Sequence, residues 1–276
     1  MSARDISHLD IFYYNEVDST MDKARELIKS YADNRIFSVI AGRQNMGRGT
    51  RGRKWLSSSS SNGNLYMTVA YKISEVPIPL TLMPLRIATL IAPCIEKRIK
   101  STSKLYLKWP NDVLIDNEKV CGILIEIENN IVLVGIGCNV CEAPMINTNG
   151  IEGGRPSTCL KNHNMNIINT VDNILTSNDN KLESLLQSHP SLLELAVDIV
   201  ESINTWLQNS DATFSVIKDF ENKMSKSTQR IRQDRLVDQS LLGKEIKPLR
   251  LNDDGSLQVY IVEDNKENTL VADYLW

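Results

Sequence analysis

The feature that most constrains this fold is a run of three strand-like segments within residues 104–140. They read KLYLKW, KVCGILIEI and IVLVGIGCNV, and each is rich in the apolar, β-branched or aromatic residues typical of strands. The last two are separated only by Glu128, Asn129 and Asn130, which predict a tight β-hairpin. We therefore expect the three segments to form the centre of a mixed β-sheet.

The residues before this run predict a strand, a helix and a second strand. IFYYNEV and IFSVIAG are strand-like and lie on either side of STMDKARELIKSYAD. Ser19 or Thr20 can cap a helix there, and Ala24, Leu27 and Ile28 form its apolar stripe. The chain thus opens with alternating elements.

Two further elements are expected between this opening and the central run. NLYMTVAYKI predicts a half-buried strand, because its apolar residues alternate from Leu65 to Tyr71. The apolar spacing from Leu80 to Lys100 is helical, and we expect Pro93 to kink or interrupt that helix.

The second half changes character twice. Residues 145–190 are polar and asparagine-rich, which indicates loops. SLLELAVDIVESINTWL then predicts an amphipathic helix, and a second helix is expected from about Thr213 to Ser227. Short strands with polar turns follow from about Gln233, so we expect a small all-β module at the C-terminal end. The fold class predicted is α+β.

Composition limits the classes of function. The chain has 276 residues and a formal net charge of −3, which argues against a protein that coats nucleic acid. Its apolar runs are shorter than a membrane span needs, and its first residues lack a secretory signal, so we expect a cytoplasmic protein. Five cysteines without a signal predict reduced thiols. The Cys138-x-x-Cys141 pair leaves a zinc or redox site as a weak alternative.

One loop is unusually basic. GRQNMGRGTRGRKW, from Gly42 to Trp55, holds five cations and four glycines without one carboxylate. Glycines let successive backbone N–H groups approach a ligand, and arginines add charged donors, so the loop suits a phosphate or carboxylate. It matches neither a P-loop nor a dinucleotide fingerprint. A solvated basic surface loop is the alternative.

A second candidate site lies in KWPNDVLIDNEKVCGILIEI. Asn111 and Asp112 follow a strand and a proline-fixed turn, a position from which functional side chains often project. Lys119 precedes Gly122, and a glycine inside a strand often marks close approach by a ligand. The alternatives are that Asp112 only forms a turn and that Lys119 is a solvated cation. The GIGCN segment that ends at Asn139 is a weaker third signal.

Taken together, these segments resemble the biotin protein ligase family. GRGTRGRKW is similar to its glycine-arginine signature loop, KWPNDV to its second signature, KVCGILIE to its lysine-bearing hairpin and VGIGCNV to its closing strand, in the same order. EVDSTMDKA resembles its first biotin-contacting segment. The resemblance is specific from residue 11 to about 141 and looser afterwards.

The resemblance implies a class II synthetase-like catalytic domain over residues 1–230, which binds biotin and ATP, and a small SH3-like β-barrel domain over residues 231–276. Arg48 and Lys119 would be the catalytic residues. The implied biotin contacts are Ser19, Thr20, Gln44, Gly47, Arg48, Gly49, Lys119, Gly122 and Gly137. The implied ATP and adenylate contacts are Arg48, Thr50, Arg51, Trp55, Asn111, Asp112, Lys119 and Asn139.

The implied reaction has two steps. The biotin carboxylate attacks the α-phosphate of ATP and expels pyrophosphate, and a lysine of a biotin carboxyl carrier domain then displaces AMP. Mg²⁺ would enter with ATP, without protein ligands of its own. No enzyme nucleophile is needed, which agrees with three scattered histidines, and fixed positive charge must align two anions that repel each other.

One position departs from the family pattern. The fourth residue of the signature loop, most often arginine in the family, is Thr50 here, and Arg51 follows it. A lost charge-assisted hydrogen bond costs about 1.5 to 3 kcal/mol, so Thr50 would weaken the grip on an adenylate. We hypothesise that Arg51 compensates.

Two alternative functions remain. Lipoate or octanoate protein ligases and transferases resemble this superfamily in fold, but their glycine-rich and histidine-bearing signatures differ from the pair found here. A non-catalytic nucleic-acid-binding module would require clustered aromatic residues, and aromatics are only 6% of the chain. No helix-turn-helix pattern precedes residue 11, so we expect a monofunctional ligase that is a monomer or weak homodimer and binds neither nucleic acid nor membrane.

Overall fold

The computed structural model describes most of the chain, in segments. The described residues are 4–5, 9–30, 36–57, 63–147, 155–163, 174–175, 190–209, 213–231 and 239–271. Most of the asparagine-rich stretch 145–190 therefore lies outside the described residues, and its expected loops stay a prediction.

The largest element is a seven-stranded sheet with the order β2-β3-β4-β8-β7-β6-β5. Only the β2–β3 pair is parallel; every other pair is antiparallel, so the predicted mixed sheet is confirmed. The strands are β2 (Asp10–Tyr14), β3 (Phe37–Ala41), β4 (Leu65–Lys72), β5 (Leu105–Lys108), β6 (Asp112–Ile115), β7 (Glu118–Glu128) and β8 (Ile131–Cys138).

The three strand segments of the sequence do not all lie at the centre of this sheet. β7 and β8 are interior strands, but β5 is an edge strand, so its expected central position is wrong. The reason is β6, a four-residue strand that inserts between β5 and β7. The predicted hairpin is confirmed: Asn129 and Asn130, with φ of 50° and 64°, form the two-residue turn between β7 and β8.

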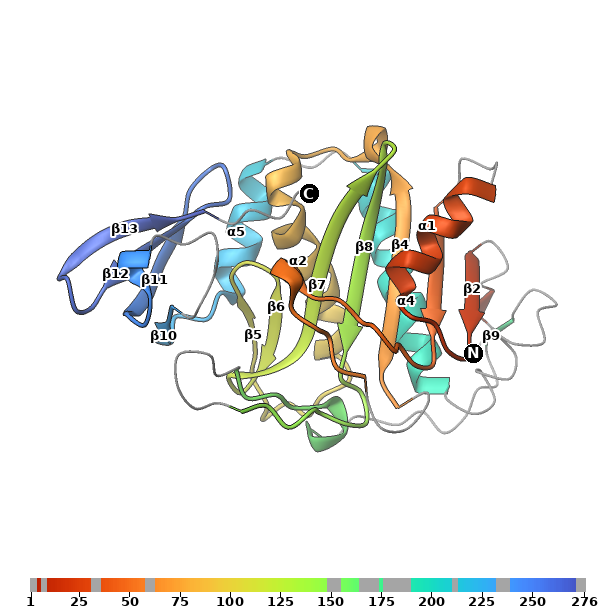
Figure 1. Cartoon of the computed structure of the whole chain (residues 1–276), viewed down its shortest axis with the longest axis horizontal. Coiled ribbons are helices and arrows are strands. Elements are labelled where there is room, and N and C mark those ends of the chain that lie inside the picture. The colour runs from red at the N-terminus through yellow and green to blue at the C-terminus, as the bar shows by residue number, and fades with distance from the viewer. Residues whose placement is uncertain are drawn as a thin grey trace.

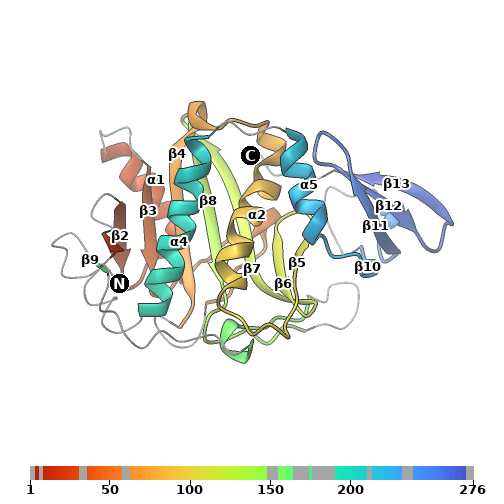
Figure 2. The ribbon, with the colours of Figure 1, turned by 180° about the vertical axis from the view of Figure 1, so that it is seen from behind.

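Helices cover both faces of the sheet (Figures 1 and 2). α1 (Thr20–Ser30) packs on one face against β3, β4 and β8, and Ala24, Leu27 and Ile28 join the apolar cluster there, as predicted. α2 (Met83–Glu96) and α4 (Pro190–Leu207) pack on the other, with α5 (Thr213–Lys223) beside α2.

This two-sided cover corrects one expectation. β4 is not half-buried: all its residues from Leu65 to Tyr71 are buried, because α1 covers one face and α4 the other. Separately, the expected interruption at Pro93 is wrong, since α2 continues through it to Glu96; the alternative, a kink at Pro93, stays a prediction. Arg98 follows the helix end, and its Nη1 donates a hydrogen bond to the Cys94 carbonyl at 2.7 Å.

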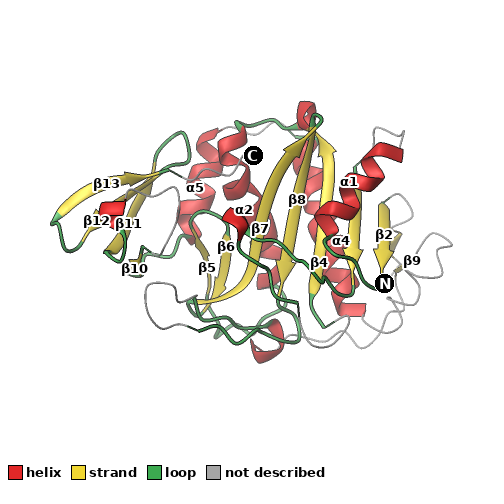
Figure 3. Cartoon of the chain, in the orientation of Figure 1, coloured by secondary structure: helices red, strands yellow, loops and turns green. Residues whose placement is uncertain are grey.

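The C-terminal strands form a separate four-stranded antiparallel sheet, which Figure 3 shows beside α5. The strands are β10 (Gln229–Arg230), β11 (Glu245–Leu251), β12 (Leu257–Ile261) and β13 (Lys266–Leu270). The predicted all-β module is thus present, although its first strand begins before Gln233. The boundary between residues 230 and 231, and the SH3-like form, stay predictions.

The remaining elements are short. β1 (Arg4–Asp5) pairs in parallel with β9 (Ile174–Leu175). Short 3₁₀ helices occur at Thr50–Gly52, Ile73–Glu75, Leu80–Leu82, Leu160–His163 and Gln239–Leu241. The indole Nε1 of Trp109 donates to the Gly255 carbonyl at 2.9 Å, so the turn after β5 contacts the small sheet directly.

Candidate functional site

The candidate site is a cavity of about 120 Å³ on the face of the sheet that α1 covers. The basic loop after β3 crosses β7 and β8 on this face (Figure 1). The lining residues come from the start of α1, that loop, β4, the turn before β6, β7 and β8: Ser19, Thr20, Met21, Gln44, Arg48, Gly49, Thr50, Arg53, Lys54, Trp55, Met67, Asn111, Lys119, Gly122, Ile123, Leu124, Gly135, Ile136 and Gly137. The segments singled out in the sequence therefore meet in one place.

Two glycines make room for an aromatic ring in this cavity. Gly122 of β7 and Gly137 of β8 are opposite each other in the sheet. A Cβ atom at Gly137 would lie 2.3 Å from Cε2 of Trp55, and one at Gly122 would lie 2.7 Å from Cζ3 of the same ring. The Trp55 side chain therefore lies directly on the glycines that the sequence assigned to biotin.

A charged cluster lies at one end of the cavity. Lys119 Nζ is 2.6 Å from Asp112 Oδ1, and Lys108 Nζ is 3.5 Å from Asp112 Oδ2. Burial alone would raise the pKa of Asp112, but the Lys119 and Lys108 ammonium groups outweigh it and lower that pKa to about 2. Burial lowers the pKa of Lys108 to about 8. Asp112 is thus a carboxylate that holds two cations.

Lys119 is fixed by its backbone as well as by Asp112. Its N–H donates to the Pro156 carbonyl at 2.8 Å, and its own carbonyl accepts from the Thr158 N–H at 3.0 Å. Its ammonium lies 5.2 Å from the ring centre of Trp55, a cation–π distance. The ammonium is thus held between a carboxylate and the ring over the cavity.

Buried hydroxyl groups and the half-buried amide of Gln44 lie at the other end of the cavity. Gln44 Oε1 accepts hydrogen bonds from the Thr20 N–H at 2.8 Å and from the Thr20 hydroxyl at 3.1 Å. The Thr68 hydroxyl donates to Thr20 Oγ1 at 2.9 Å, and Ser19, at the start of α1, is only 1% exposed. The start of α1 and the loop after β3 are therefore joined by side chains that the sequence assigned to biotin.

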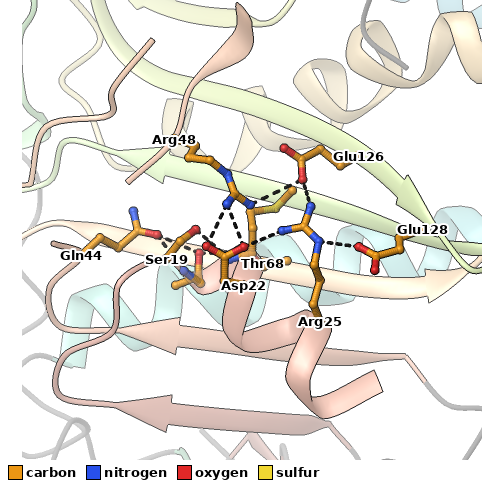
Figure 4. A network of polar contacts seen from close by, with 10 residues as sticks. Ser19, Asp22, Arg25, Gln44, Arg48, Thr68, Glu126 and Glu128 are labelled. Carbon is orange, nitrogen blue, oxygen red and sulfur yellow. Dashed lines mark hydrogen bonds and ion pairs between the residues drawn. The ribbon is translucent and has the colours of Figure 1, made fainter. Parts of the chain in front are cut away.

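The Arg48 side chain reaches from the basic loop to Asp22 of α1. Its Nη1 donates to both carboxylate oxygens of Asp22, at 2.7 and 2.8 Å, and its Nη2 lies 3.5 Å from Glu126 Oε2 (Figure 4). Arg25 bonds the same Asp22 at 2.7 Å and also pairs with Glu126 and Glu128. The predicted catalytic arginine is therefore part of a network of two guanidinium and three carboxylate groups.

Thr50 accepts hydrogen bonds from Arg53. Arg53 Nη2 donates to Thr50 Oγ1 at 2.5 Å, and Arg53 Nε donates to the Thr50 carbonyl at 3.1 Å. The side chain of Arg51 lies outside the described residues, so compensation by Arg51 stays a hypothesis. Thr50 and Arg53 both line the cavity.

Three of the predicted site residues, Gly47, Asp112 and Asn139, are absent from the cavity lining among the residues that the structure describes. Gly47 lies just behind it, where a Cβ would be 2.6 Å from the Trp55 carbonyl oxygen. Asp112 lies next to the cavity and pairs with Lys119 at 2.6 Å. The side chain of a further predicted residue, Arg51, lies outside the described residues. Asn139 directly follows β8 and is 2% exposed. Its side chain donates to the Thr158 carbonyl at 3.1 Å and does not line the cavity. Its role toward a nucleotide stays a prediction.

Sequence reasoning missed several lining residues. Arg53 and Lys54 belong to the same basic loop, and Gly135 belongs to the same Gly-x-Gly pair as Gly137, so both signals were available. Met21 and Met67 gave no signal, because only their place in the tertiary structure brings them to the cavity. Asn111 was identified; its Nδ2 donates to the Ile123 carbonyl at 2.7 Å, which ties the turn to β7.

The described parts of the chain contain neither a metal-ligand cluster nor a membrane span. No group of three or more of their His, Cys, Asp or Glu side chains is arranged to hold a metal ion. Among the helices that the structure describes, none is long and apolar enough to cross a bilayer.

Comparison with known sequences gives a consistent set of relatives. Residues 13–140 match the model of the Biotin/lipoate A/B protein ligase family. The biotin--[acetyl-CoA-carboxylase] ligase of Mycobacterium tuberculosis is 35% identical over 111 residues, 38% of this chain and 40% of that protein. The bifunctional ligase/repressor BirA of Bacillus subtilis is 33% identical over 141 residues, 49% of this chain and 41% of that protein. The chain thus spans about two fifths of each relative.

Comparison with solved structures extends over nearly the whole chain. The biotin protein ligase of Leishmania major, in complex with biotinyl-5-AMP, superposes with a TM-score of 0.63 and 26% identity, over 95% of this chain and 99% of that one. The likeness therefore includes the small C-terminal sheet as well as the large one.

Proposed function

We propose that the protein is an ATP-dependent biotin protein ligase, on the premise that residues 13–140 match the model of the Biotin/lipoate A/B protein ligase family. It would activate biotin as biotinyl-5'-AMP and transfer the biotinyl group to a lysine of an acceptor protein. The names of its relatives and the ligand bound by its structural neighbour support this proposal.

One observation carries the proposal: Arg48, from the loop after β3, and Lys119, from β7, line the same small cavity. Joining a carboxylate to a phosphate brings two anions together, so a catalyst must supply positive charge that is already in place. Lys119 is held by Asp112 at 2.6 Å, and Arg48 is held by Asp22. Both cations are therefore fixed before a substrate arrives.

The rest of the cavity suits the neutral part of biotin. The buried hydroxyl groups of Ser19 and Thr20 and the half-buried amide of Gln44 would hydrogen-bond the ureido ring. Ile123, Ile136 and Met67 add apolar lining near the glycines. We assign this end to the biotin ring and the Lys119 end to the reacting carboxylate and the nucleotide.

The chemistry follows in two balanced steps. A biotin carboxylate oxygen forms a bond to the α-phosphorus of ATP while the bond to the β-phosphate oxygen breaks, and pyrophosphate leaves. The acceptor lysine, as a neutral amine, then attacks the carbonyl carbon; AMP leaves and the amine loses a proton. Mg²⁺ enters with ATP as part of that substrate, and no residue of this chain is assigned to hold it.

The loop that bears Trp55 would move when the nucleotide binds. Ligand pockets usually enclose 300 to 1,000 Å³, whereas this cavity is about 120 Å³ because the Trp55 ring lies on Gly122 and Gly137. Displacement of the ring would open the site, and the ring could then stack on the nucleotide base.

The acceptor would be the biotin carboxyl carrier domain of a carboxylase, and the name of the Mycobacterium tuberculosis relative, which specifies acetyl-CoA carboxylase, supports a carboxylase as the acceptor. We place the reaction in the cytoplasm and expect a monomer or a weak homodimer that binds no nucleic acid. Lipoate is the competing substrate, because the family model covers lipoate ligases as well.

The test is exchange of labelled pyrophosphate into ATP, which reports the first step alone. We expect exchange that depends on biotin and does not occur with lipoate or octanoate in its place. Exchange with lipoate only would identify a lipoate ligase, and an absence of exchange with any of the three acids would refute acid activation.

A further inference from the structure

We propose that Asp22 is a positioning residue of this site, which holds the Arg48 guanidinium so that its remaining donor edge, Nε and Nη2, can receive the carboxylate of biotin. The inference rests on the proposed function, because biotin is the anion it assigns to Arg48. It concerns a side chain of α1 that lies within the EVDSTMDKA segment but is neither among the predicted site residues nor part of the cavity lining.

Asp22 binds Arg48 with both of its carboxylate oxygens. Arg48 Nη1 donates to both Asp22 oxygens, at 2.7 and 2.8 Å, across two separate elements (Figure 4). The backbone on the loop side is fixed too: Arg48 forms a β-bridge with Lys54, and the Gly49 N–H donates to the Arg53 carbonyl at 2.7 Å. The direction of the guanidinium is therefore set from both ends.

The rest of the guanidinium is left for a ligand. Arg48 Nε and Nη2 are buried and have no hydrogen-bond partner among the described residues. Nη2 is 3.5 Å from Glu126 Oε2, an ion pair that is too long for a hydrogen bond. Because this edge carries two parallel N–H groups, it matches a carboxylate, which can accept both. Buried donors without acceptors are unfavourable, and such a ligand would satisfy them.

Asp22 is itself held in place. Arg25 Nη1 donates to Asp22 Oδ1 at 2.7 Å, and Arg25 Nε donates to Glu128 Oε2 at 2.5 Å. Arg25 also pairs with Glu126, so α1 is tied to β7 beside Asp22. The contact between Asp22 and Arg48 is therefore already formed in the absence of a ligand.

Two alternative roles for Asp22 would lead to different experimental outcomes. A carboxylate in the first turn stabilises a helix through its dipole, and that effect would change the melting temperature but not the affinity for biotin. The network holds three carboxylates and two guanidinium groups, so its field is net negative and repels an anion. If only this field mattered, removing the Asp22 charge would tighten biotin binding. A positioning role predicts weaker binding.

The test compares biotin dependence in the pyrophosphate exchange assay and biotin binding by calorimetry. For Asp22→Asn we expect the KM and Kd for biotin to rise roughly tenfold to a hundredfold, the range of one charge-assisted hydrogen bond, with a smaller change in kcat. Glu26→Gln is the matched control: its carboxylate lies on the same helix and pairs with Lys23 at 2.6 Å. We expect that variant to bind biotin within about twofold of the wild type, because a surface ion pair contributes little.

A double-mutant cycle decides whether Asp22 acts through Arg48. In an Arg48→Ala background, Asp22→Asn should weaken biotin binding no further. A full additional loss in that background, or an Asp22→Asn protein with unchanged or tighter biotin binding, would overturn the inference. Wild-type protein that binds biotin but shows no exchange would refute the proposed function while the binding data still decide the role of Asp22; wild-type protein that binds no biotin would refute both.

Discussion

The contact between Trp55 and Gly137 gives a prediction whose size can be worked from the structure. A Cβ added at Gly137 would lie 2.3 Å from Cε2, 2.6 Å from Cζ2 and 2.7 Å from Nε1 of the ring. Carbon atoms attract best at about 3.5 to 4.0 Å, so the ring must move by about 1 Å or more. The Trp55 backbone resists this movement, because its N–H donates to the Gly47 carbonyl at 2.9 Å.

We therefore expect Gly137→Ala to destabilise the protein. Overpacking of this kind costs about 1 to 3 kcal/mol, which corresponds to a melting temperature lower by roughly 2 to 10 °C for a chain of this size. In a Trp55→Ala background the clashing atoms are gone. Gly137→Ala should then be neutral or stabilising by up to about 1 kcal/mol, because alanine restricts the unfolded chain.

Thermal unfolding of the four proteins in this cycle measures the effect. Gly49→Ala serves as the control, because a Cβ at Gly49 would meet its nearest atom, the Arg53 carbonyl oxygen, at 3.5 Å, an ordinary contact. The placement of the Trp55 ring would be refuted if Gly137→Ala had the melting temperature of the wild type. It would also be refuted if Gly137→Ala lowered the melting temperature by the same amount in the Trp55→Ala background.

Two other predictions concern Thr50 and Asp112. Thr50→Val removes the acceptor of the Arg53 hydrogen bond, so we expect the KM for ATP to rise about threefold to tenfold, whereas Thr50→Ser should stay near the wild type; equal values for the two variants would contradict this role. The pKa of Asp112 is lower in the folded protein than in the unfolded chain, so its stabilisation, roughly 2 kcal/mol, is present above about pH 4 and is lost as the pH falls toward 2. The difference in free energy of unfolding between the wild type and Asp112→Asn, measured by urea unfolding, should therefore shrink between about pH 5 and pH 3. A difference that stays constant over this range would contradict the lowered pKa of Asp112.

Local chemistry explains which parts of the fold were predictable. The β7–β8 hairpin was identified because Asn129 and Asn130 adopt the left-handed backbone that its turn requires. β6 was missed because its four residues lie between two polar turns and read as part of a loop. The cover on both faces of β4 could not be read either, because alternation in one strand does not reveal what packs against its second face.

The site follows the same rule. Its glycine-rich loop and the segment from Lys108 to Gly122 were found because their residue types are unusual for their position. The contact of Arg48 with Asp22 was not, since it joins residues 26 positions apart and depends on how α1 lies against the loop. The ring of Trp55 over Gly137 is likewise a product of tertiary structure.

Transfer of biotin to an acceptor protein tests the central claim most directly. The purified full chain would be incubated with labelled biotin, ATP, Mg²⁺ and a biotin carboxyl carrier domain, beside Lys119→Ala and the exposed-lysine control Lys100→Ala. We predict label on the carrier lysine that requires ATP, is lost by roughly a hundredfold or more in Lys119→Ala and is unchanged in Lys100→Ala. No transfer by the wild type would contradict the account, and full transfer by Lys119→Ala would remove that lysine from it.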